Sequence, residues 1–97
     1  MKVENMKSSR GNKVANQFII EGGSIWYRGK ITQTGEMFQS YISAIAFRTY
    51  DGKVYIDENK WDYSTTTGKY SNIFLGETKA ETQKKIDSGV YILTDLN

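Results

Sequence analysis

The dipeptide Asp51-Gly52 separates two short runs, residues 48–50 and 53–56, that are rich in β-branched and aromatic residues. A tight type I′ turn needs a positive φ at both central positions, and Asp-Gly is among the pairs that adopt it most readily. The dipeptide therefore predicts a β-hairpin in which Arg48 faces Tyr55, with the guanidinium against the ring. Such a hairpin is the start of an antiparallel sheet.

Two earlier segments also have the pattern of strands. Residues 17–21 and 24–27 flank Gly22-Gly23, which predicts a second hairpin with Ile19 opposite Trp26. Residues 41–47 are apolar on both faces of an extended chain, which is typical of a strand that is central in its sheet or covered on each side.

After Trp61 the spacing of apolar residues changes to that of helices. Ser64 or Thr65 can cap a helix that ends at Gly76, and Thr78 opens a second helix that runs to about residue 88. Residues 90–93 then form a closing strand. We therefore expect an α+β fold, a curved antiparallel sheet of about five strands with two short helices between the penultimate and last strands.

Charge divides the chain unevenly. Residues 1–13 carry four positive charges and one negative charge, whereas residues 14–97 carry nine positive and ten negative charges. The first segment shows neither strand alternation nor an apolar helical stripe. We expect residues 1–13 to be a flexible basic leader and residues 14–97 to be a single α+β domain.

The amino-acid composition excludes several kinds of catalytic and metal site. Histidine, cysteine and proline are all absent from the 97 residues. Zinc sites of the usual ligand sets, thiol nucleophiles and Ser-His machinery therefore cannot be built, and we expect neither an enzyme nor a cofactor. No apolar run approaches the ~20 residues that cross a membrane, so we expect a cytoplasmic protein with no membrane contact.

Two polar segments are weaker candidates for ligand binding. An anion could be held at a helix start by Thr66, Thr67, Gly68 and Lys69, although capping alone also explains this segment. It is not a P-loop, because Tyr63 stands where that motif has its first glycine. The acidic segment at residues 57–62 could hold a hard cation but is also an ordinary solvated turn, and we predict no metal site.

Amphipathic rings are more numerous than a small core needs. Tyrosine and tryptophan beside arginine are typical of protein interfaces, of sheets that stack nucleic-acid bases, and of cores that keep polar tips wet. As partner-binding residues we select one aromatic and basic set near the predicted hairpins: Trp26, Tyr27, Arg28, Arg48, Tyr50 and Tyr55.

Residues 61–70, followed by Phe-Leu-Gly at 74–76, resemble a pattern in small proteins of phages, prophages and plasmids of Gram-positive bacteria. Those proteins share a W-D-Y-S, T-T, K-H and F-L-G core, preceded by strands similar to residues 38–41 and 52–55 here. The resemblance covers about residues 36–94, with Tyr70 in place of the usual histidine. It implies a family without an assigned function or catalytic residues, in a bacterial host cell.

That context favours a non-enzymatic accessory protein that binds and inhibits a host defence protein, anti-CRISPR proteins being the nearest class. The partner would be a host protein such as a defence nuclease or its complex. Two alternatives remain open, a single-stranded nucleic-acid-binding module and a sponge for a phosphorylated small-molecule signal. A homodimer through an open sheet edge is also compatible with strands that no proline protects.

Overall fold

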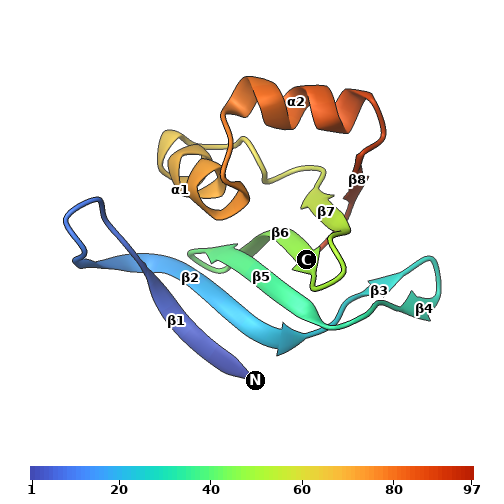
Figure 1. Ribbon diagram of the computed structural model, residues 1–97, viewed down its shortest axis with the longest axis horizontal. Coiled ribbons are helices and arrows are strands. Elements are labelled where there is room, and N and C mark those ends of the chain that lie inside the picture. Colours follow the sequence, from blue (N-terminus) through green and yellow to red (C-terminus); the bar gives the residue numbers. More distant parts are fainter.

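The computed structural model describes all residues, 1–97, and confirms the α+β class. The main sheet has six strands (Figure 1), which in spatial order are β1 (Lys2–Lys7), β2 (Lys13–Gly23), β5 (Gly35–Ser40), β6 (Ser43–Thr49), β7 (Val54–Asp57) and β8 (Tyr91–Thr94). All neighbours are antiparallel except β7 and β8, which are parallel. The parallel pair follows from the two helices between them, since a crossover returns the chain in the same direction.

The two helices form where they were predicted. Helix α1 (Thr65–Leu75) is capped by Ser64, whose hydroxyl accepts from the Thr67 N–H, and it ends at Gly76 in the left-handed conformation. Helix α2 (Lys79–Asp87) opens with a complete capping box between Thr78 and Glu81. Each signal acts within one turn of the chain, which is why the sequence alone locates both helices.

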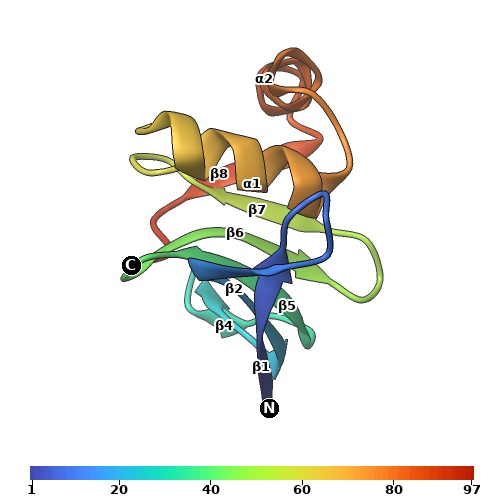
Figure 2. The ribbon, with the colours of Figure 1, turned by 90° about the vertical axis from the view of Figure 1, so that its left-hand side faces the viewer.

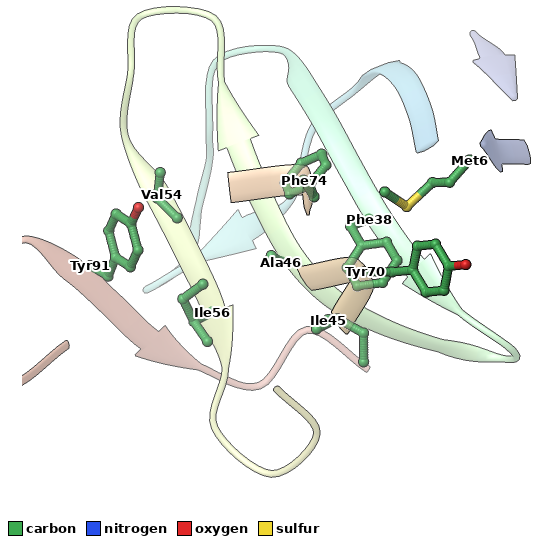
Figure 3. Packing of buried hydrophobic residues seen from close by; sticks show 9 residues of the cluster. All are labelled: Met6, Phe38, Ile45, Ala46, Val54, Ile56, Tyr70, Phe74 and Tyr91. Carbon is green, nitrogen blue, oxygen red and sulfur yellow. The ribbon is translucent and has the colours of Figure 1, made fainter. Parts of the chain in front are cut away.

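The main core lies between α1 and one face of the sheet (Figure 3). Tyr70 and Phe74, one turn apart on α1, point onto the sheet, and Phe74 stacks on Phe38 with ring centroids 5.8 Å apart. The fully buried residues Ala46 and Ile56 continue this layer across β6 and β7. Of the strand predicted at residues 41–47, the part from residue 43 on is central in the sheet, and residues 45–47 are buried on both faces, as the apolar pattern predicted.

Several strand predictions are wrong. Residues 1–13 are not an irregular leader, because β1 pairs along β2 and buries Met6 in the core. The sequence hides this strand because only Met6 on it is buried. Residues 41 and 42 are not extended, since Tyr41 has a φ of 56° and turns the chain between β5 and β6.

The hairpin predicted at Gly22-Gly23 does not form. Strand β2 runs through both glycines and pairs with β1 and β5, so Ile19 faces Phe38 and not Trp26. The reversal comes later, at Arg28-Gly29, between β3 (Trp26–Tyr27) and β4 (Lys30–Ile31). A glycine pair permits a turn, but two long neighbouring strands stabilise an extended chain more.

The Asp51-Gly52 hairpin is present with its register shifted by one residue. Phe47 pairs with Tyr55 and Arg48 pairs with Val54, where we predicted Arg48 opposite Tyr55. The loop is longer by one residue because the Thr49 hydroxyl accepts from the Lys53 N–H and donates to the Asp51 carboxylate. A shift of one residue moves a side chain to the other face of a sheet, so Arg48 and Tyr55 point to opposite sides.

Candidate contact surface

The face of the sheet opposite the helices carries only the small β3–β4 hairpin, which lies below the sheet in Figure 2. We call it the helix-free face. Its hairpin turns at Arg28 and Gly29, with φ values of 50° and 77°, which is the type I′ geometry. Arginine adopts a positive φ at a cost, because its Cβ crowds the backbone in this conformation. The turn thus places a cation at the hairpin tip at the expense of local stability.

The hairpin contacts the sheet through one aromatic pair. The ring of Tyr27 meets that of Tyr55 edge-on, with centroids 5.1 Å apart, and Tyr55 in turn lies 6.3 Å from Phe47. The Arg28 guanidinium lies 5.3 Å from the centroid of Tyr27. Tyr55 and Phe47 are buried, so this trio is a small second core on the helix-free face. It holds the hairpin against the sheet.

On the outer side of the hairpin, Trp26 pairs with Ile31 across the strands. Trp26 is 71% exposed and Ile31 is 63% exposed. Tyr50, on the neighbouring β6–β7 loop, is exposed too, and its N–H donates to the Thr34 carbonyl next to the hairpin. Large apolar side chains that are exposed to solvent close to one another are typical of contact surfaces.

A groove of about 560 Å³ lies between the hairpin and the β6–β7 loop. Tyr27, Ile31 and Tyr55 supply its apolar lining, and Thr32, Gln33 and Thr49 add neutral polar groups. Its charged residues are three cations and one carboxylate: Arg28, Lys30, Lys53 and Asp51. We call this the cationic groove.

None of the three cations forms an ion pair within the chain, because each of the four ion pairs of the structure lies elsewhere. The Asp51 carboxylate accepts from the Thr49 hydroxyl, and this bond lowers its pKa, with help from the charge of Lys53. Asp51 therefore stays ionised but is engaged in shaping its own loop. The groove keeps an excess of positive charge.

The helix-free face also carries a continuous line of apolar side chains. Directly paired residues place their side chains on the same face of a sheet, so the strand registers define one row across all six strands. We call it the apolar row, and its members are Val3, Ile20, Met37, Phe47, Tyr55 and Ile92. The hairpin covers the middle of this row, whereas Val3 is exposed and Ile20, Met37 and Ile92 are partly exposed.

The structure brings together most of the predicted partner-binding residues. Tyr27, Arg28 and Tyr55 line the cationic groove, and Trp26 and Tyr50 stand exposed beside it. Tyr55 is only 5% exposed, so it packs beneath the contact surface and offers a partner little area.

Arg48 is the exception, because it points to the helix side of the sheet. Its guanidinium donates to the Glu36 carboxylate and, at 3.0 Å, to the Phe74 carbonyl near the end of α1. It also lies 4.5 Å from the centroid of the Phe74 ring. Arg48 thus ties α1 to the sheet and is not part of the contact surface.

The predicted anion segment is spread over different environments. Thr67 is fully buried, and its hydroxyl is shared with those of Ser40 and Ser64 at 2.9 and 3.0 Å. Thr66 and Lys69 are exposed, and Gly68 lies beside Lys69 in a shallow groove. The Ser64 cap already takes the Thr67 N–H, so the segment shows capping and no converging donors.

The acidic segment after β7 serves the fold. The Asp57 side chain is buried and accepts from the N–H groups of Asn59 and Leu96 and from the Asn97 amide. It thereby fastens the carboxyl-terminal residues beside β7. No group of three or more carboxylates is arranged to hold a metal ion.

Lys30, Ile31 and Lys53 belong to the surface but were not selected from the sequence. The first two follow the reversal at Arg28-Gly29, a hairpin turn that was not among the turns predicted from the sequence. Lys53 could be selected only with the true length of the β6–β7 loop, because that length decides which side of β7 faces the groove.

Comparison with known proteins adds a family but no activity. A family described as "Family of unknown function (DUF8033)" matches residues 1–89. This match includes residues 1–30, which lay outside the resemblance noted from the sequence. No curated protein and no solved structure matches the chain. Neither helix is long and apolar enough to cross a membrane.

Proposed function

The chain belongs to that family of unknown function, and we propose that it is a non-enzymatic binding protein that acts by covering a surface of another protein. The observation that carries the proposal is the Trp26–Ile31 pair, which stands exposed on the helix-free face beside three cations that form no ion pair. Tryptophan and arginine are the residues that most often dominate the binding energy of protein interfaces.

The finer part of the proposal concerns the partner. The resemblance of residues 36–94 to phage, prophage and plasmid proteins supports an accessory protein of a mobile element. We propose that it inhibits a bacterial host defence protein, such as a nuclease or its complex, in the manner of anti-CRISPR proteins. Inhibition by covering a site needs a rigid, preorganised surface rather than catalytic groups. The Tyr27–Tyr55 contact supplies such rigidity to the hairpin.

A protein partner fits this surface better than single-stranded nucleic acid does. Base stacking needs exposed ring faces in a row, whereas Phe47 and Tyr55 of the apolar row are buried, and the exposed rings of Trp26 and Tyr50 stand on two separate elements. The exposed members of the row, such as Val3, are aliphatic and offer no ring. A sponge for a phosphorylated signal is also less supported, because the groove mixes its three cations with a carboxylate and with neutral and apolar side chains.

Affinity capture tests the proposal. The tagged chain is incubated with lysate of a Gram-positive host at moderate salt, treated with nuclease, and the eluate is assayed for stoichiometric protein and for nucleic acid. We expect one host protein that survives nuclease and whose activity falls when the chain is added. Trp26→Ala with Ile31→Ala should weaken its binding at least about 100-fold, the scale of two interface hot spots.

Ile73→Ala is the matched control, because Ile73 is 51% exposed on the outer side of α1, away from the helix-free face. It should leave capture unchanged. Recovery of nucleic acid without a protein, or equal losses from the control and the hairpin variants, would contradict the proposed function.

A further inference from the structure

The cationic groove differs from the rest of the contact surface in its chemistry. Trp26 and Ile31 form an apolar projection, whereas the groove behind them combines a polar wall with Arg28, Lys30 and Lys53. The one carboxylate in the groove, Asp51, is hydrogen bonded to Thr49 and forms no ion pair with these cations. The groove therefore carries a net positive charge, with no ion pair inside the chain to any of its cations.

The arrangement of the cations selects the shape of that ligand. Arg28 and Lys30 come from the β3–β4 hairpin, and Lys53 follows the β6–β7 turn just before β7. Cations that two separate hairpins supply to one groove match several anionic groups spaced along a chain, rather than one phosphate. Carboxylates on an extended peptide are spaced in this way, since alternate side chains point to the same side.

The aromatic rings of the groove argue against nucleic acid as that chain. Tyr55 is covered by Tyr27, and the Arg28 guanidinium lies over Tyr27. The rings inside the groove are thus already engaged with each other and with Arg28, which leaves little ring face for a base, and stacking is the main source of affinity for single strands besides phosphate contacts. Ile31 instead offers an aliphatic contact for an apolar side chain between the carboxylates.

We propose that the cationic groove binds an acidic, extended peptide segment of the partner protein, with its carboxylates paired to Arg28, Lys30 and Lys53 and an apolar side chain against Ile31. This inference rests on the proposed function, because it assigns the partner's chemistry at the same surface. It adds that recognition is charge-selective and salt-sensitive, whereas the Trp26–Ile31 projection alone would bind with little dependence on salt.

The test uses the full chain labelled with ¹⁵N and three probes: a hexapeptide of alternating glutamate and leucine, the same peptide with lysine for glutamate, and a thymidine hexanucleotide. We expect the acidic peptide to shift the amide signals of residues 28–33 and 49–53. The lysine peptide should leave them unchanged. Raising the salt concentration from 50 to 500 mM should weaken binding of the acidic peptide about tenfold or more, as screening requires.

Charge reversal supplies the decisive comparison. The double variant Lys30→Glu with Lys53→Glu should bind the acidic peptide at least about tenfold more weakly, because two attractive contacts become repulsive. Lys69→Glu changes the same kind of exposed lysine on α1, outside the groove, and should weaken it less than about twofold.

Each contrary result overturns the inference. Absence of shifts in the groove, equal losses from Lys69→Glu, or tighter binding of the thymidine probe than of the acidic peptide would do so. A captured partner that binds the double lysine variant as tightly as the unaltered chain would also refute the groove assignment, while leaving the proposed function intact. Loss of capture with Trp26→Ala alone bears on the proposed function and not on the groove.

Discussion

The rings of Tyr27 and Tyr55 meet edge-on, with centroids 5.1 Å apart and planes inclined at 61°. This contact joins a hairpin of two-residue strands to the six-stranded sheet. A two-stranded hairpin is marginal in water by itself, so its position depends on what it contacts. The pair therefore links stability to function, since it holds the exposed Trp26–Ile31 projection in place.

Tyr27→Ala should release the hairpin without unfolding the sheet. Loss of the ring contact should lower the free energy of unfolding by about 2 kcal/mol. Trypsin should then cleave after Arg28 and Lys30 several times faster than in the unaltered chain, as followed by mass spectrometry. Tyr63→Ala, which removes an exposed ring elsewhere, is the control. Equal cleavage rates in both variants would show that the ring pair does not hold the hairpin.

Arg28→Asn should stabilise the fold and weaken binding. Residue 28 has a φ of 50°, and asparagine adopts the left-handed conformation more readily than arginine does. We expect a gain of about 0.5–1 kcal/mol in urea unfolding, together with weaker binding of the acidic hexapeptide. Arg28→Lys keeps both the charge and the strain, so its stability should be unchanged. A loss of stability in Arg28→Asn would refute the strained-turn account.

Gly35→Ala should be strongly destabilising. A Cβ at Gly35 would lie 2.0 Å from the Arg48 carbonyl oxygen and 2.6 Å from the Thr49 Cα, both backbone atoms of β6. Paired strands cannot separate at one position without losing hydrogen bonds, so we expect the free energy of unfolding to fall by about 3 kcal/mol. Gly68→Ala, in open space on α1, should instead gain about 1 kcal/mol from helix propensity. A lower melting temperature for Gly35→Ala and a higher one for Gly68→Ala, each relative to the unaltered chain, would confirm both accounts.

Glu77 should make the stability of the fold depend on pH. Its side chain is 4% exposed, and its carboxylate accepts from Lys85, Thr82 and Tyr91. Burial acts to raise its pKa, but these three hydrogen bonds outweigh burial and hold the pKa below its ordinary value of 4.5. The carboxylate therefore stabilises the folded state fully above pH 4.5, and this contribution is lost as the pH falls through the lowered pKa.

The variant Glu77→Gln tests this pH dependence of stability. At pH 7 the variant should be about 1–3 kcal/mol less stable than the unaltered chain in urea, because a charged acceptor of three donors is lost. The difference should shrink as the pH is lowered below 4.5. A difference that stays constant with pH would indicate that the charge of Glu77 contributes nothing.

Gln17→Met should raise stability. Gln17 is fully buried, and neither its amide oxygen nor its nitrogen has a hydrogen-bond partner. Methionine has a similar shape without the polar atoms, so we expect a gain of about 1 kcal/mol in urea unfolding. Gln39→Met serves as the comparison, because Gln39 donates to the Tyr41 carbonyl at 2.8 Å and should lose stability slightly. A destabilised Gln17→Met variant would mean that the buried amide is satisfied in solution.

Part of the candidate surface was accessible from the sequence. Trp26, Tyr27 and Arg28 are close together in the chain, and the surplus of amphipathic rings marked them as contact residues. Arg48 was misplaced for one reason, the length of the β6–β7 loop, which a hydrogen bond from the Lys53 N–H to the Thr49 hydroxyl extends by one residue. The cationic groove required two hairpins distant in sequence to be set against each other.

The sequence by itself determined what depends on a few consecutive residues. The caps of α1 and α2, the reversal at Asp51-Gly52 and the apolar run of β6 act within one turn or one strand, so their signals are local. Only the tertiary structure decided the partners of the strands and the faces they expose. Strand β1 forms because β2 offers it an edge, and Gly22-Gly23 stays extended because two neighbours pair with β2. Pairing energy between distant segments has no local signature, and one residue of register decides which side chains face the partner.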